Sequence, residues 1–124
     1  MGSATVVAVA RSHRRVALGD VEEATQVSNE RVIARRIVVH GRVQGVFFRA
    51  TTRDQARQAG VNGWVRNRAD GAVEAWLEGP VSAVERVLSW VEAGGPSRAH
   101  VDDVEVAEEL PGGHRRFAVR PDEA

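Results

Sequence analysis

Segment 40–49, with the sequence HGRVQGVFFR, has the residue types and spacing to bind a small anion. It follows a run rich in Val and Ile and ends in an arginine where a helical pattern begins. Main-chain N–H groups in such a loop and at a helix N-terminus bind phosphate, and an arginine adds a charged fork of donors. From glycine spacing alone, an ordinary strand-to-helix loop with a surface arginine is an equally good interpretation. The predicted cradle consists of Arg49 and the N–H groups of Gln44, Gly45, Val46, Phe47 and Phe48.

The composition excludes several other kinds of site. Cysteine and lysine are absent, so the chain has no thiolate metal ligand, cysteine nucleophile, Schiff-base lysine or Walker A lysine. The formal net charge is zero, and the chain as a whole is therefore not built to bind nucleic acid. Its apolar runs are far shorter than the roughly 20 residues of a membrane helix. We expect no membrane contact, and the cytoplasm is the default location.

The length of 124 residues fits one domain with an additional tail. Residues 31–121 carry steady strand and helix periods, whereas residues 1–30 mix short charged and polar patches with no period. We therefore predict a disordered N-terminal extension over residues 1–30 and a folded domain over residues 31–121. A signal segment or an added strand is the alternative interpretation of the extension.

The cradle needs a strand before it and a helix behind it, and the sequence pattern predicts both. Residues 32–43 alternate as a strand does, and residues 48–59 repeat at helical spacing up to Gly60, which suits a helix end. The adjacent acids Asp102 and Asp103 interrupt a later strand and predict a bulge. The remaining predicted elements are strands at 61–67, 72–77, 100–108 and 117–119, a hairpin turn at Asp70-Gly71, and a helix between Pro80 and Gly94.

This order, β-α-β-β-α-β followed by a short extra C-terminal strand, is that of a ferredoxin-like α+β sandwich. We expect an antiparallel sheet with two helices on one of its faces. The fold hosts many functions, so the function must be argued from the site.

Two motifs resemble those of a known family. Residues 41–49 (GRVQGVFFR) look like the signature of the acylphosphatase family. Residues 63–67 (GWVRN), followed by Asp70-Gly71 and Val73, look like its second signature. The resemblance covers about residues 33–121, with the two motifs in the family's order and at its separation, and leaves the N-terminal stretch outside.

The resemblance implies hydrolysis of acyl phosphates to a carboxylate and inorganic phosphate, with no metal, cofactor or covalent intermediate. Arg49 and the loop amides would bind the phosphoryl group, and the side chain of Asn67 would hold the attacking water. In isolation, Asn67 would be interpreted as a turn residue beside Asp70. Inorganic phosphate would be the product and a competitive inhibitor, and we expect a monomer.

The sequence departs from some family members near both motifs. Arg68 and Ala72 stand where certain relatives carry threonines that support the asparagine, so the orientation of Asn67 is expected to rest on the backbone or on water. Phe47 occupies a position that is often small in the family, and we expect it to alter the rim of the cradle. These differences bear on rate and substrate preference.

The residue pattern also allows other interpretations. A non-catalytic module that binds phosphate, an acyl phosphate or nucleic acid has the same fold, although RNA recognition domains need exposed aromatic residues on the central strands. His100, Asp102 and Asp103 do not all face one way along a strand, so we expect a solvated edge and no metal site there. His40 lies on the strand face opposite Gly41 and is expected to be structural.

Overall fold

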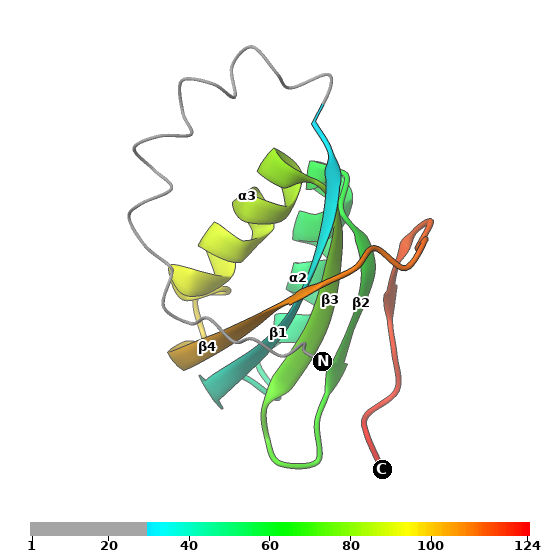
Figure 1. Cartoon of the computed structure of the whole chain (residues 1–124). Coiled ribbons are helices and arrows are strands. Elements are labelled where there is room, and N and C mark those ends of the chain that lie inside the picture. Colours follow the sequence, from blue (N-terminus) through cyan, green and yellow to red (C-terminus); the bar gives the residue numbers. More distant parts are fainter. Residues whose placement is uncertain (1–29) are drawn as a thin grey trace.

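The computed structural model describes residues 30–124 (Figure 1). The predicted extension therefore lies outside the described residues, except for Glu30. The order of elements is the predicted one. Within the described range, no helix has the length and hydrophobicity of a membrane span. The elements are β1 (Val32–Arg42), α2 (Phe48–Ala59), β2 (Asn62–Asn67), β3 (Val73–Pro80), α3 (Val81–Glu92), β4 (His100–Glu109) and β5 (Phe117–Val119).

The strands form one sheet in the order β4-β1-β3-β2-β5. The pairs among the first four strands are antiparallel, which confirms the predicted ferredoxin-like arrangement. The short last strand differs, because β5 pairs in parallel with β2. After β4, the chain crosses to the opposite edge of the sheet and Phe117 pairs with Gly63, near the start of β2. The two strands therefore run in the same direction.

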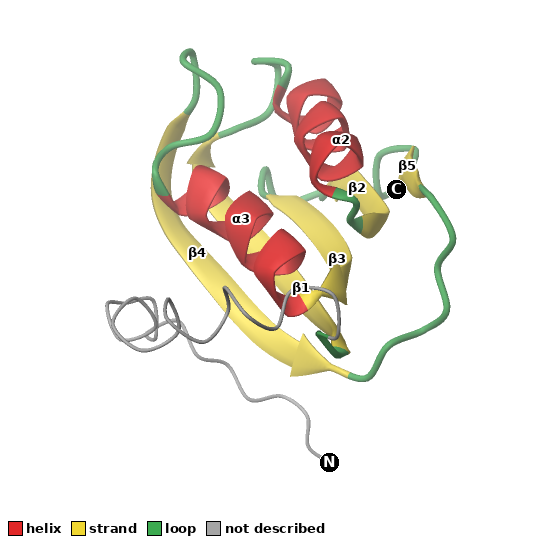
Figure 2. Ribbon diagram, turned by 90° about the horizontal axis from the view of Figure 1, so that it is seen from above, coloured by secondary structure: helices red, strands yellow, loops and turns green. Residues whose placement is uncertain are grey.

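Both helices lie on one face of the sheet, as Figure 2 shows, and the core fills the space between the two layers. In α3, the apolar residues at helical spacing, Val84, Val87, Leu88 and Val91, are all buried. Burial of apolar side chains from strands and helices is the main favourable contribution to folding. The core side chains include Ile37, Val39, Phe48, Val65, Leu77, Val84, Val87, Leu88, Val91 and Phe117.

The structure refines two predicted strands. The register between β1 and β4 shifts after the pair His40–Asp103, and Asp102 is the extra residue, so the predicted bulge is confirmed. Gly41 lies at this shift, where an added Cβ would collide with the carbonyl oxygen of His100. The strand predicted at 72–77 continues to Pro80, because its last residues still pair with the start of β1.

Glu30 secures the first turn of α3. Pro80, at the N-cap position of this helix, has no side-chain oxygen to accept hydrogen bonds from the free N–H groups. The Glu30 carboxylate accepts them instead, from the Ser82 N–H at 2.6 Å and from the Ser82 hydroxyl at 2.9 Å. A carboxylate at this end also suits the helix dipole.

Glu78 holds the segment that leads to β5. Its buried carboxylate accepts hydrogen bonds from the indole N–H of Trp76 (2.8 Å) and the N–H groups of Gly112 (2.9 Å) and Gly113 (2.8 Å). The N–H of His114 donates a further bond at 3.2 Å. Burial by itself raises the pKa of the Glu78 carboxyl, but these donors favour the charged form and the pKa is lowered overall. The charged carboxylate therefore contributes to stability.

Replacing Glu78 by glutamine should lower the free energy of unfolding at neutral pH by about 1–3 kcal/mol, because the amide offers one acceptor to four donors. Since the folded pKa lies below the unfolded value, this contribution is complete above pH 4.5 and disappears as the pH falls through the folded pKa. Urea unfolding of both proteins between neutral pH and pH 3 should show the difference shrinking with acid. Glu108→Gln, on an exposed position of β4, is the matched control. A pH-independent difference would contradict the charge-based explanation.

Candidate active site

The loop between β1 and α2 turns sharply at two residues with positive φ. Gly45 has a φ of 77°, and Phe47 has a φ of 65° and a ψ of 22°. Glycine adopts this conformation without steric cost, whereas a residue with a Cβ loses about 1–2 kcal/mol. Phe47 is the one non-glycine residue with positive φ in the described part of the chain. Such local strain is common where a loop has a binding role.

The main-chain N–H groups of this loop are free to bind a ligand. The first main-chain hydrogen bond donated after the loop joins the Thr51 N–H to the Phe47 carbonyl oxygen at 3.0 Å. Within residues 30–124, the N–H groups from residue 45 to residue 50 therefore have no acceptor in the protein. The first turn of α2 also carries no acidic residue. This end of the helix suits an anion.

Gln44 joins the loop to the hairpin between β2 and β3. Its side-chain Nε2 donates to the carbonyl oxygens of Arg68 and Ala72, both at 2.9 Å. These carbonyls close the hairpin, because the Arg68 N–H also donates to the Ala72 oxygen at 2.8 Å. The side chain of Gln44 thus sets the distance between the loop and the end of β2. From the sequence, Gln44 was expected to contribute only its main-chain N–H to the cradle, and this role of its side chain was not predicted.

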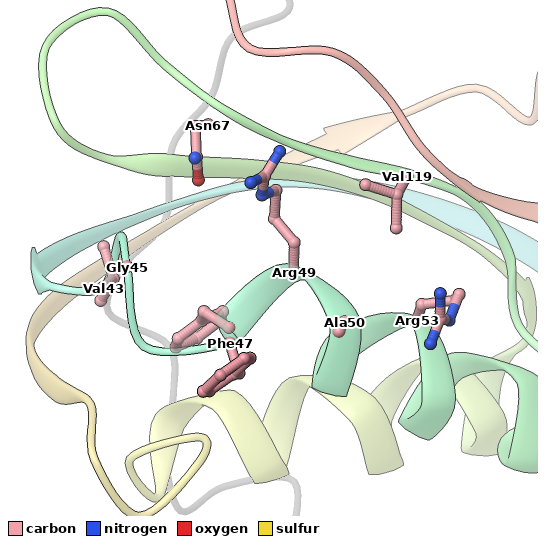
Figure 3. A pocket seen from close by; sticks show the side chains of 9 residues that line it. Val43, Gly45, Phe47, Arg49, Ala50, Arg53, Asn67 and Val119 are labelled. Carbon is pink, nitrogen blue, oxygen red and sulfur yellow. The ribbon is translucent and has the colours of Figure 1, made fainter.

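Asn67 is the last residue of β2 and is 7% exposed. Its main-chain carbonyl oxygen accepts a hydrogen bond from the Glu123 N–H at 2.9 Å, and this bond fixes the backbone at Asn67. The carboxamide of Asn67 makes no hydrogen bond to any residue from 30 to 124. Figure 3 shows it pointing toward the same space as the guanidinium of Arg49. Its polar atoms are therefore available to a ligand or a water molecule.

A cavity of about 400 Å³ lies where the loop, α2 and β2 meet (Figure 3). Of the predicted site residues, Gln44 and Val46 do not line it, since Gln44 bridges to the hairpin and Val46 packs against the core. The other five predicted residues share the cavity, although Asn67 comes from a different part of the chain. The lining residues are Val43, Gly45, Phe47, Phe48, Arg49, Ala50, Arg53, Asn67 and Val119.

The model of the acylphosphatase family matches residues 35–119. The chain belongs to the acylphosphatase family. An acylphosphatase of Rubrobacter xylanophilus is 46% identical over 110 residues, covering 88% of this chain and 92% of that protein. An acylphosphatase of Haloarcula marismortui is 54% identical over 84 residues, covering 68% and 91%. The crystal structure of the Bacillus subtilis acylphosphatase has a TM-score of 0.67 and 40% identity, covering 71% of this chain and 98% of that one.

The C-terminal residues of this family member contact both parts of the site. Asp122 Oδ1 lies 2.9 Å from Nη1 of Arg49, and the next residue binds the main chain of Asn67. Glu123 also accepts a hydrogen bond from the Ala69 N–H at 2.8 Å. The carboxylate of Asp122 thus neutralises Arg49 when no other anion is bound. Residue-pattern reasoning missed this partner, because it follows the predicted end of the domain and no local motif marks it.

The other candidates from the sequence lie away from the cavity. His40 forms a contact of 2.9 Å with Glu105, and His100 forms one of 3.1 Å with Asp102, both between exposed or half-exposed side chains. In residues 30–124, no cluster of three or more His, Cys, Asp or Glu side chains has an arrangement that could hold a metal. Four residues of the cavity lining were not predicted from the sequence, namely Val43, Ala50, Arg53 and Val119. Arg53 is the charged one among them, and its signal was the four-residue spacing from Arg49 on one helix face.

Proposed function

We propose that this protein hydrolyses acyl phosphates to a carboxylate and inorganic phosphate. Membership of the acylphosphatase family supports the reaction. The observation that carries the assignment of roles is the shared cavity. One wall provides free loop N–H groups and Arg49, and the opposite wall provides the carboxamide of Asn67. A site of this kind can both bind a phosphoryl group and position a water molecule beside it.

The phosphoryl group is held by the N–H groups of residues 45–50 and by the guanidinium of Arg49. The substrate's phosphate replaces Asp122 on Arg49, because it offers more oxygens and more negative charge than one carboxylate. Phosphoryl transfer depends mainly on positioning and on neutralising the charge of the equatorial oxygens. The arginine and the amides supply this neutralisation, so the proposed site uses no metal and no cofactor.

Asn67 holds the water that attacks phosphorus in line with the leaving carboxylate. Its carboxamide oxygen accepts a hydrogen bond from the water, which directs the water oxygen toward phosphorus and aligns the two reactants. A new bond forms between the water oxygen and phosphorus while the bond to the acyl oxygen breaks, and the water proton passes to the phosphate. The leaving carboxylate has a conjugate-acid pKa of about 4, so it departs without a general acid. No histidine or cysteine is needed.

A non-catalytic module that binds phosphate or an acyl phosphate is the second candidate. The free N–H groups and Arg49 would serve binding alone, and Asn67 is the residue that favours hydrolysis over binding. Inhibition by inorganic phosphate follows from the same cradle, since product and substrate share the phosphoryl group. A monomer located in the cytoplasm stays a prediction of the sequence.

Purified protein should hydrolyse benzoyl phosphate in the presence of EDTA, with inorganic phosphate as a competitive inhibitor. The loss of benzoyl phosphate is followed by its ultraviolet absorbance, with a sample without protein to subtract spontaneous hydrolysis. Binding of phosphate, measured by calorimetry, without any turnover would favour the binding module. Turnover that disappears with EDTA and returns with a divalent metal would contradict the metal-free mechanism.

A further inference from the structure

The cavity extends beyond the part that a phosphoryl group would occupy. Asn67 and Gly45 lie at one end, Arg49 lies in the middle, and Arg53 lies at the other end (Figure 3). The wall between Arg49 and Arg53 is apolar. It consists of Ala50 and the side chain of Val119, which is 39% exposed. Because the leaving acyl group must point away from Asn67 for in-line attack, this far end is where the acyl group would lie.

Arg53 gives the far end a second positive charge. It stands one helical turn after Arg49, about 6 Å further along the axis, on the same face of α2. Its Nε and Nη2 both contact Oδ1 of Asp54 at 3.1 Å. A guanidinium carries five N–H donors, so this contact leaves several of them for a ligand in the cavity. Arg57, one turn further on, donates to the Phe117 carbonyl oxygen at 3.0 Å and has a structural partner.

We propose that Arg53 is a specificity-determining residue that binds a second anionic group on the acyl part of the substrate. The substrate class is an acyl phosphate whose acyl group carries a carboxylate, separated from the acyl carbon by a short apolar spacer that packs on Ala50 and Val119. This inference rests on the proposed function and adds the chemistry of the acyl group. The competing explanation is that Arg53 only forms a surface ion pair with Asp54, whose side chain is 59% exposed.

An anionic substrate and a neutral substrate separate these explanations. 3-Carboxybenzoyl phosphate and 3-methylbenzoyl phosphate differ in one ring substituent, which is an anionic carboxylate in the first and a neutral methyl group in the second. The rigid ring prevents the carboxylate from attacking its own acyl group. The measured quantity is the kcat/KM of the carboxylate substrate divided by that of the methyl substrate. Because both contain the same phosphoryl group, damage to the cradle or to the fold lowers both values and leaves the quotient unchanged.

For Arg53→Gln, we expect the quotient to fall by about fivefold, the effect of one partly exposed ion pair. For Asp54→Asn, we expect it to rise, because Arg53 loses its competing carboxylate. The matched control is Arg86→Gln, which removes the same charge from an exposed position on α3 and should leave the quotient at the wild-type value. Raising the salt concentration should reduce the wild-type quotient more than that of Arg53→Gln.

Three results would overturn the proposal. A quotient that is equal in the wild type, Arg53→Gln and Arg86→Gln would assign Arg53 to the surface ion pair. A fall in both Arg53→Gln and Arg86→Gln would indicate a general effect of net charge. Absence of turnover of both substrates by the wild type would contradict the proposed function itself, and this inference would fall with it.

Discussion

Replacing Arg49 by alanine should lower the kcat/KM for benzoyl phosphate by at least about 100-fold, which corresponds to about 3 kcal/mol of transition-state stabilisation. The guanidinium is the one cationic side chain in the middle of the cavity, and the loop amides alone cannot neutralise the phosphoryl oxygens. Steady-state kinetics gives the effect on turnover, and the inhibition constant of phosphate gives the effect on binding. Arg49→Ala should lower kcat/KM and also raise the inhibition constant of phosphate, because the same guanidinium binds the ground state and the transition state.

Two further variants show whether this loss comes from the positive charge of Arg49, from its planar guanidinium or from its ion pair with Asp122. Asp122→Asn breaks the contact with Arg49 but keeps the guanidinium, so its turnover should stay far above that of Arg49→Ala. Arg49→Lys keeps the charge and loses the planar fork, and its activity should lie between the two. Equal loss in Arg49→Ala and Asp122→Asn would mean that the ion pair acts on the fold and that Arg49 is not a phosphate ligand.

Replacing Asn67 by alanine should lower kcat for benzoyl phosphate by about 100-fold and leave inhibition by phosphate nearly unchanged. The reason is that the carboxamide aligns the water, whereas the cradle that binds phosphate comes from the other wall of the cavity. Losing one preorganised hydrogen-bonding group in a catalytic site typically costs about 3 kcal/mol of barrier. Both kcat and the inhibition constant of phosphate are obtained from one set of initial-rate measurements at several phosphate concentrations.

Asn62 provides a matched control for this substitution. It is an asparagine at the opposite end of β2, and its side chain donates to the His114 carbonyl oxygen at 3.1 Å, away from the cavity. Asn62→Ala should therefore affect stability more than kcat. If Asn67→Ala weakened phosphate binding as strongly as it lowered kcat, Asn67 would be a phosphate ligand, and another residue would have to position the attacking water.

Much of the site was predictable because its signals are local. A helix that begins at Phe48 and ends before Gly60 depends on spacing and end residues within a few positions. Asp70 forms the turn after β2, where its side chain accepts from the Ala72 N–H at 3.0 Å. The position of Asn67 at the end of β2 follows from this turn. Local patterns therefore placed both halves of the site on their elements.

The contacts that join the two halves were not predictable, since they link residues far apart in the chain. The side chain of Gln44 reaches carbonyls of the β2–β3 hairpin, which requires the two segments to lie side by side in the folded sheet. The same holds for Asp122, whose contact with Arg49 depends on where β5 leads the chain. No residue near Gln44 or Asp122 in the sequence signals these partners.

The sequence by itself determined the order of strands and helices and the two motifs that carry the site, because periodicity, turn residues and helix ends depend on neighbouring residues. Only the tertiary structure decided that β5 runs parallel to β2, that Asp122 neutralises Arg49 and that Arg53 faces the far end of the cavity. These features depend on sheet order and on the packing of α2 against the sheet. Such packing is a property of the whole domain, to which residues from both ends of the described chain contribute.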